Sequence, residues 1–285
     1  MKKVISIVLA VLASIVLVCT LAVTPIMYGV GAFVTEETFV NVLQDLDYAE
    51  VLSSGGDIQQ ELGFTAEEVN AIMRTEAMKE IMEVYVSDLF MPINGDYRTE
   101  TLTLEKAQDI IREHADELNP YTASFFKAYG FEEEIPTDEL TEYTVELFSS
   151  YTAIFPSADD LGITDASTLA VIQALKSGVV ILPLVVVAAI LSLIVLVCRL
   201  KKFESMLWLG VDYGLAGLAT FGIANALNSA GTVDASLVAY APILSAFASN
   251  VQIASLVILG LAVVFVAVHF VGKKLKSKKQ EEIAL

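Results

Sequence analysis

The sequence predicts an all-α fold with four transmembrane helices and a large extracytoplasmic α-helical domain inserted between spans one and two. Three observations support this prediction. Four stretches of the 285-residue chain are apolar over the roughly 20 residues that a helix needs to cross about 30 Å of hydrocarbon. An acidic segment separates the first stretch from the second. Within that segment the apolar residues recur with helical rather than strand periodicity.

The four spans are expected at about residues 4–28, 178–198, 206–227 and 251–271. Backbone amides in lipid must be hydrogen-bonded within their own segment, so these spans are predicted to be helices. The resulting division is an N-terminal anchor (1–29), an acidic helical domain (30–176), a three-helix membrane bundle (177–272) and a basic tail (273–285).

The first span has two interpretations. It begins with Lys2 and Lys3 and could be a signal peptide with a cleavage site near Ala22. Its apolar run is longer than the usual 7–15 residues of a signal peptide, which favours a retained anchor. Cys19 is a poor lipoprotein site because Val18 precedes it where a small residue is expected.

Basic residues predict the orientation of the spans. Ten of the 17 flank the spans on one side: Lys2, Lys3, Arg199, Lys201, Lys202, Lys273, Lys274, Lys276, Lys278 and Lys279. The positive-inside rule then places both termini and the 199–204 turn in the cytoplasm, and residues 30–176 outside. We therefore expect a multi-pass protein of the cell membrane. The basic tail either contacts anionic headgroups or serves only as a stop-transfer flank.

Charge and cysteine content narrow the class of protein further. Residues 29–177 hold 30 acidic and 7 basic residues, a formal net charge of −23, against −18 for the whole chain. Such a segment repels phosphate, so no nucleic-acid partner is expected. It contains no cysteine and no Asn-x-Ser/Thr acceptor, a composition typical of a bacterial cell surface.

The first helices of the acidic domain have clear start signals. Thr35 is a candidate N-cap ahead of an apolar stripe, and Thr65 with Glu68 has the form of a capping box. Thr75 can restart the second of these helices. Residues 94–96 (Asn-Gly-Asp) predict a turn after it.

The later helices are delimited by proline and glycine. A third helix is expected over residues 104–118, ended by Asn119 and Pro120, and a short one over 121–129, closed by Gly130. Another is expected to start after residue 136, and its aromatic stripe is interpreted as core: Leu140, Tyr143, Leu147, Phe148, Tyr151 and Phe155. The last begins near Thr164 and can run unbroken into span two.

The acidic domain shows no residues that predict catalysis, a cofactor or a metal. His114 is its only histidine, and the spacing places it on an apolar helix face with Glu117 beside it, so it is interpreted as a core or boundary residue. A metal site needs several convergent ligands. The acidic pairs 159–160 and 45–47 do not have the EF-hand spacing, and the first is better explained by a helix start.

The membrane bundle contains two ionisable residues of interest. Asp212 lies eight residues beyond Glu204, and His269 lies four residues before Lys273, so they sit roughly 12 Å and 6 Å from the inner end. Intramembrane charges tend to find a partner or water. One hypothesis is that they form a functional pair between spans three and four. The alternative is that both are interfacial.

Span three is also rich in glycine, and four positions are candidates for helix packing: Gly210, Gly214, Gly217 and Gly222. Small residues allow two helix backbones to approach closely. This approach can occur within the chain or between two copies, so a homo-oligomer through span three is a possible partner arrangement alongside the lipid bilayer.

Some stretches resemble known classes of protein. Residues 39–52, 73–89 and 207–210 (Leu-Trp-Leu-Gly) resemble uncharacterised four-span membrane proteins of Gram-positive-type bacteria, a resemblance that supplies no activity. The topology is similar to that of permease-like subunits of the cell-division and macrolide-export transporter class, but the short 199–205 turn leaves little room for an ATPase. We therefore expect a non-enzymatic protein whose outer domain binds or senses an envelope or membrane protein partner. The alternative is a transport or permease-type subunit using spans two to four.

Overall fold

The computed structural model describes residues 2–53, 63–96, 98, 101–131, 133–152, 155–198, 204–233 and 237–284. Side chains are described for all of these except residues 2–5, 51–53, 232, 239 and 277–284. The described part of the chain is helical and contains no strand, which confirms the all-α prediction. Several basic residues used to predict the orientation lie outside it: Arg199, Lys201 and Lys202 with their backbone, and Lys2, Lys3, Lys278 and Lys279 with their side chains.

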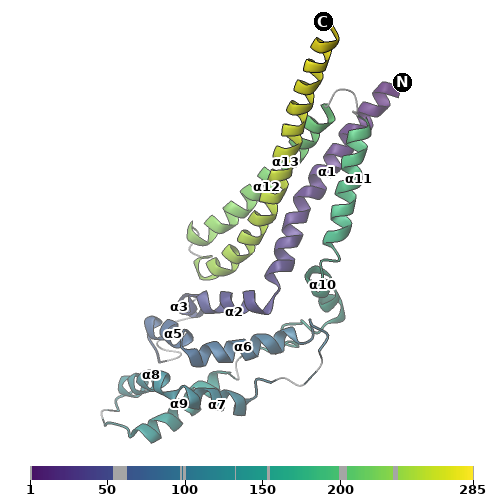
Figure 1. Ribbon diagram of the computed structural model, residues 1–285. Helices are drawn as coiled ribbons and strands as arrows, with labels where there is room; N and C mark the ends of the chain where they lie inside the picture. The colour runs from purple at the N-terminus through teal and green to yellow at the C-terminus, as the bar shows by residue number, and fades with distance from the viewer. Residues whose placement is uncertain are drawn as a thin grey trace. The chain divides into compact units, whose positions relative to one another are not determined.

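The helices fall into two compact units (Figure 1). The membrane unit comprises Met1–Phe33, Ala174–Ser229 and Leu244–Leu285, and the acidic unit comprises Val34–Gln173 and Ala230–Ile243. In chain order the elements are α1 (Lys2–Phe33), α2 (Glu36–Asp45), α3 (Tyr48–Ser53), α5 (Ala66–Met73), α6 (Glu76–Phe90), α7 (Leu104–Glu113), α8 (Ala115–Ala128), α9 (Thr137–Thr152), α10 (Ala166–Lys176), α11 (Ile181–Cys198), α12 (Glu204–Val233), the 3-10 helix η1 (Val238–Tyr240) and α13 (Ala241–Ala284).

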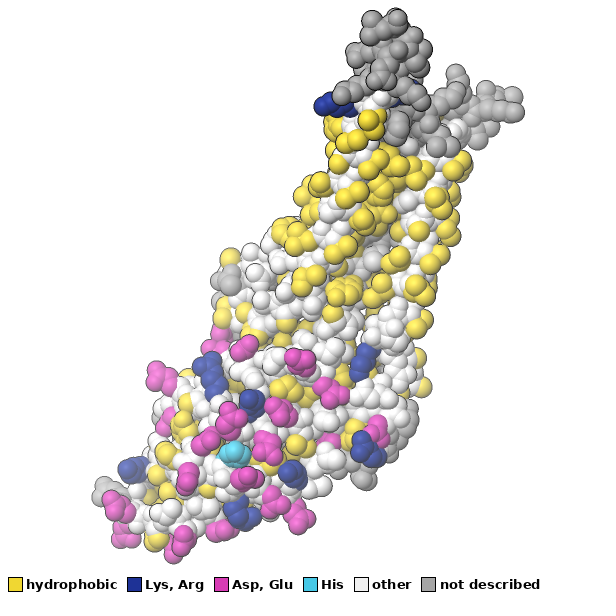
Figure 2. All heavy atoms as spheres, in the orientation of Figure 1, with side chains coloured by type: hydrophobic (Ala, Val, Ile, Leu, Met, Phe, Trp, Pro, Cys, Tyr) yellow, Lys and Arg dark blue, Asp and Glu magenta, His cyan; other side chains and the backbone are white. Residues whose placement is uncertain are grey.

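Four helices are long and apolar enough to cross a membrane: Ser6–Phe33, Ile181–Cys198, Glu204–Gly231 and Ala241–Lys276. They correspond to the four predicted spans, and they identify a multi-pass membrane protein. Hydrophobic side chains cover the visible face of these helices (Figure 2). Large apolar side chains such as Leu182, Leu193 and Leu218 are exposed on them, as expected of surfaces that face lipid.

In the membrane unit, α1 packs along α11 and α12 packs along α13. The Ser6 hydroxyl near the start of α1 donates to the Cys198 carbonyl at the end of α11 (2.9 Å), so these two helices run antiparallel. One buried cluster joins all four helices through residues such as Leu17, Val195, Leu209 and Ile258. The starts of α1 and α12 therefore lie at the same end of the unit as the ends of α11 and α13.

The acidic unit has its own hydrophobic core. Its central cluster contains buried side chains from each of the helices α5, α6, α7, α8 and α9, including Ile81, Ile111, Leu118 and Phe148. A second cluster, around Phe90, joins α6 to partly buried side chains of α2 and α10. Burial of large side chains from most of its helices allows this unit to fold around its own interior rather than around the lipid-facing spans.

The predicted helix starts are confirmed. The Thr35 and Thr75 hydroxyls accept from the amides of Thr38 and Met78. At Thr65 the capping box is complete, and the Glu68 carboxylate also accepts from the Ser124 hydroxyl of α8 (2.6 Å). This last hydrogen bond is the largest cause of the lowered pKa of Glu68. A local capping motif thus also links α5 to α8.

The predicted helix over residues 104–118 is wrong. The chain breaks at His114 (φ −107°, ψ 22°), where α7 ends and α8 begins. Pro120 lies inside α8, so it does not end a helix as expected. Because α8 starts at Ala115, Pro120 removes only the one hydrogen bond to the Asp116 carbonyl. Both helices pack on α9.

The predicted continuity from the last acidic helix into span two is also wrong. A turn over residues 177–180 separates α10 from α11, and Gly178 occupies it with φ +68°. A residue with a Cβ rarely adopts this left-handed backbone, so the glycine permits a break that apolar periodicity does not reveal. The two compact units also group residues 230–243 with the acidic unit, where η1 contacts α3, rather than with the spans.

Candidate functional site

The two ionisable residues singled out in the spans both lie inside the membrane unit. Asp212 of α12 is 4% exposed, and His269 of α13 is 7% exposed. They share the buried face of their helices with Leu209, Ala216 and Ala262. Neither side chain therefore belongs to the lipid-facing surface, where a carboxylate is most costly.

The register of α12 against α13 determines how the two residues are placed along this seam. A Cβ on Gly210 would lie 2.6 Å from Val266 Cγ2, and one on Gly217 would lie 2.7 Å from Leu259 Cγ. With this antiparallel register, His269 lies level with about residue 207, roughly 7.5 Å along the axis from Asp212. The fold brings the two residues to one seam but does not place them directly opposite each other.

Hydroxyl groups that sequence reasoning missed continue the polar line through the membrane unit. The Tyr213 and Ser192 hydroxyls lie 3.1 Å apart and join α12 to α11. The Ser255 hydroxyl of α13 lies 2.8 Å from that of Thr220 on α12. Tyr213 and Thr220 are seven residues apart, or two helical turns, so they lie on the same face of α12. This spacing of polar residues within the third span is the sequence signal that could have predicted the line.

The four glycines proposed for helix packing behave differently. Gly210 and Gly217 approach α13 too closely for a Cβ, and a Cβ on Gly214 would make an ordinary contact with Ala262. A Cβ on Gly222 would have no described neighbour within 4 Å, so this residue does not pack against α13. Gly31 of α1 is a close approach that the sequence did not reveal, since a Cβ there would lie 2.6 Å from the Leu175 carbonyl oxygen.

In the acidic unit, His114 lies at the α7–α8 break between two carboxylates. Its Nε2 is 3.4 Å from a Glu80 oxygen of α6, and its Nδ1 is 3.7 Å from a Glu117 oxygen of α8. Glu117 also accepts from the Glu76 amide at the start of α6 (3.0 Å). Among the described residues, no group of three or more His, Cys, Asp or Glu is arranged to hold a metal ion.

The acidic pairs have structural hydrogen bonds. Asp160 accepts from the amide and hydroxyl of Ser157, and these bonds lower the pKa of the Asp160 carboxyl. Asp47 accepts from the Asn70 amide group, which is the largest cause of its lowered pKa. Both carboxylates therefore stabilise local turns and helix contacts.

The aromatic stripe of the 137–155 region is core only in part. Phe148 is buried and stacks on Phe64, as predicted. Tyr143 instead is 44% exposed and points to the other side of α9, where it meets Phe126 of α8 with ring centroids 5.2 Å apart. Phe126 also contacts Phe131, which follows α8 and is 59% exposed.

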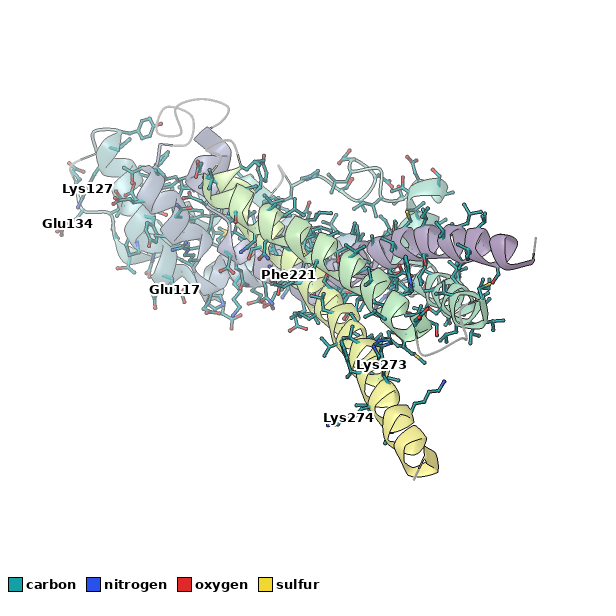
Figure 3. All side chains as sticks on the ribbon, turned by 90° about the horizontal axis from the view of Figure 1, so that it is seen from above. Glu117, Lys127, Glu134, Phe221, Lys273 and Lys274 are labelled. Carbon is teal, nitrogen blue, oxygen red and sulfur yellow. The ribbon has the colours of Figure 1, made fainter. Side chains whose placement is uncertain are left out.

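Two of these rings, the half-buried Phe126 and the exposed Phe131, line a pocket between the end of α8 and the start of α9. It has a volume of about 200 Å³ and is lined by Ala123, Phe126, Lys127, Phe131, Glu133, Glu134, Ile135 and Leu140. Lys127 and Glu134 mark it at one end of the acidic unit (Figure 3). We call Phe126, Phe131, Tyr143 and this pocket the α8–α9 surface.

The chain matches no protein-family model, no curated protein and no solved structure. The resemblances to four-span bacterial proteins and to permease-like subunits therefore stay predictions.

Proposed function

We propose that this protein is a multi-pass protein of a bacterial cell membrane whose acidic unit lies outside the cell membrane and binds an envelope partner. In this proposal both termini are cytoplasmic, and the protein acts as a non-enzymatic interaction or regulatory module. The observation that carries it is the α8–α9 surface, where the exposed rings of Phe131 and Tyr143 pack on the half-buried Phe126 of a unit that already buries a core of its own. Exposed apolar clusters of this kind are typical of protein interaction sites.

The membrane unit supports the orientation. The starts of α1 and α12 lie at the same end of this unit as the ends of α11 and α13. Lys273 and Lys274 extend from α13 at this end (Figure 3). With this end in the cytoplasm, the basic residues that flank the spans in the sequence satisfy the positive-inside rule.

Cysteine labelling tests the orientation. The only two cysteines are Cys19 and Cys198, so replacing both with alanine gives a cysteine-free background. We expect a Ser150→Cys variant, in α9, to react with a membrane-impermeant maleimide in intact cells, and a Lys276→Cys variant to react only after lysis. The reverse pattern would contradict the proposal.

We also propose, as a second candidate, a transport role for the membrane unit, because a polar line runs along its interior from Asp212 and His269 to Thr220 and Ser255. This candidate predicts that an ion flux into proteoliposomes is lost in Asp212→Asn and retained in Ser255→Ala, which removes one hydroxyl from the same line. Equal ion fluxes in the wild-type protein and the Asp212→Asn variant would rule out this transport candidate.

A further inference from the structure

The α8–α9 surface is strongly acidic as well as aromatic. Residues 121–152 contain seven acidic residues and one basic residue, Lys127. Glu133 and Glu134 line the pocket itself, and Asp138 and Glu139 are exposed on the first turn of α9. Aromatic faces and carboxylates around one pocket both attract cations, the rings through their negative π-face and the carboxylates through their charge.

The size of the pocket limits what can enter it. At about 200 Å³ it is smaller than the 300–1,000 Å³ pockets that enclose drug-sized ligands. It suits one long side chain of a larger partner. Phe131, which lines the pocket, and Tyr143, which packs on the pocket residue Phe126, stay exposed, so their rings provide apolar contact for the residues next to that side chain.

The charge of the surface also argues against two other occupants. A second copy of this chain that docked through the same surface would place carboxylates against carboxylates, since a two-fold interface brings the same patch together. An anionic bilayer surface would be repelled for the same reason. A basic partner gains from both charge and aromatic contact.

We propose that the α8–α9 surface binds a basic, aromatic-containing peptide segment of a partner protein, with one arginine or lysine side chain in the pocket. Arginine suits the pocket better than lysine. Its planar guanidinium stacks on aromatic rings and donates two parallel hydrogen bonds to one carboxylate. This inference rests on the proposed function, since it names the partner chemistry of the same acidic unit.

Peptide binding to the full-length protein in an uncharged detergent tests this. The probes are a fluorescent nonapeptide with a central Phe-Arg-Leu and two flanking lysines, the same peptide with citrulline for arginine, and one with glutamate at all three basic positions. We expect fluorescence anisotropy to show about threefold to tenfold weaker binding of the citrulline peptide, the range expected for loss of one cation–π contact with a carboxylate partner. The glutamate peptide should not bind. Equal binding of the arginine and citrulline peptides would overturn the proposal.

Matched variants of the protein localise the binding. We expect Phe131→Ser and Glu134→Gln each to weaken binding of the arginine peptide by about threefold to tenfold. Leu104→Ser and Glu105→Gln, which alter an equally exposed apolar residue (Leu104, 56% exposed) and an equal charge on α7, should change it less than about twofold. A similar loss of peptide binding in both pairs of variants would show that the overall charge of the protein attracts the peptide. That result would overturn the proposal.

Two further outcomes separate this inference from the proposed function. Binding of the protein to phosphatidylglycerol vesicles that is lost in Phe131→Ser would assign the surface to lipid and overturn the peptide proposal. Cross-linking of an envelope partner to the acidic unit in cells, undiminished by Phe131→Ser and Glu134→Gln, would overturn the inference but support the proposed function. Labelling of the Ser150→Cys variant only from the cytoplasmic side would overturn the proposed function whatever the peptides do.

Discussion

Gly210→Ala is expected to destabilise the membrane unit by about 1–3 kcal/mol, the usual cost of forcing an extra carbon into a packed interior. The added Cβ would lie 2.6 Å from Val266 Cγ2 and 3.2 Å from the Ala262 carbonyl oxygen. The valine has few rotamers to escape into, and the carbonyl is backbone, so α12 and α13 must move apart. The detergent-solubilised protein is heated to a series of temperatures and then run on size-exclusion chromatography. The measurement is the temperature at which half of the monodisperse peak is lost.

Gly222→Ala provides the matched control on the same helix. A Cβ at this position has no described neighbour within 4 Å, so the midpoint should stay the same or rise slightly, because alanine has the higher helix propensity. Equal loss in the two variants would show that close approach to α13 is not what the glycine at position 210 provides. A change in particle size for Gly222→Ala alone would instead support a homo-oligomer that forms through the face of span three that does not contact α13.

Asp88→Ala is expected to destabilise the acidic unit by about 2–4 kcal/mol, because it removes several hydrogen bonds to one charged acceptor. The buried Asp88 carboxylate of α6 accepts from the amide and hydroxyl of Thr101 (2.9 and 2.6 Å) and from the amide of Leu102 (2.7 Å). These residues directly precede Thr103, the N-cap of α7. Hydrogen exchange followed by mass spectrometry on the full-length protein should show faster exchange over residues 101–113.

Two comparisons make the Asp88 result specific. Asp88→Asn keeps the size of the side chain but presents an amide group to backbone donors, so it should lose most of the same stability. Glu146→Ala removes an exposed carboxylate from α9 and should stay within about 0.5 kcal/mol of the wild type. Unchanged exchange over residues 101–113 in Asp88→Ala would refute the idea that this carboxylate holds the start of α7.

The spans and the caps were the parts of the fold that the sequence predicted best, and both have local causes. A run of apolar residues long enough for a bilayer predicts a helix wherever it occurs, because no neighbour is needed to satisfy its backbone. The capping box at Thr65 likewise depends only on residues three positions apart. The prediction failed at His114 and Pro120, where one helix ends and the next continues through the proline, and both helices pack on α9.

The candidate sites were predictable to a smaller degree. Charge inside a span identified Asp212 and His269, and the structure places both in the interior of the membrane unit. The α8–α9 surface was missed because helical spacing assigned Tyr143 to the core stripe together with Phe148. The two residues are five positions apart, about 140° around a helix, so one of them can face the core while the other faces water.

By itself the sequence determined the helical class, the four spans, the acidic character of the inserted segment and the helix starts, since each depends on composition or on residues within a few positions. Tertiary structure alone decided which glycines meet α13, the register that separates Asp212 from His269 along their seam, and the aromatic rings that remain exposed. These features depend on where a second helix lies. That position is set by the packing of side chains far apart in the chain, so spacing within one helix does not specify it.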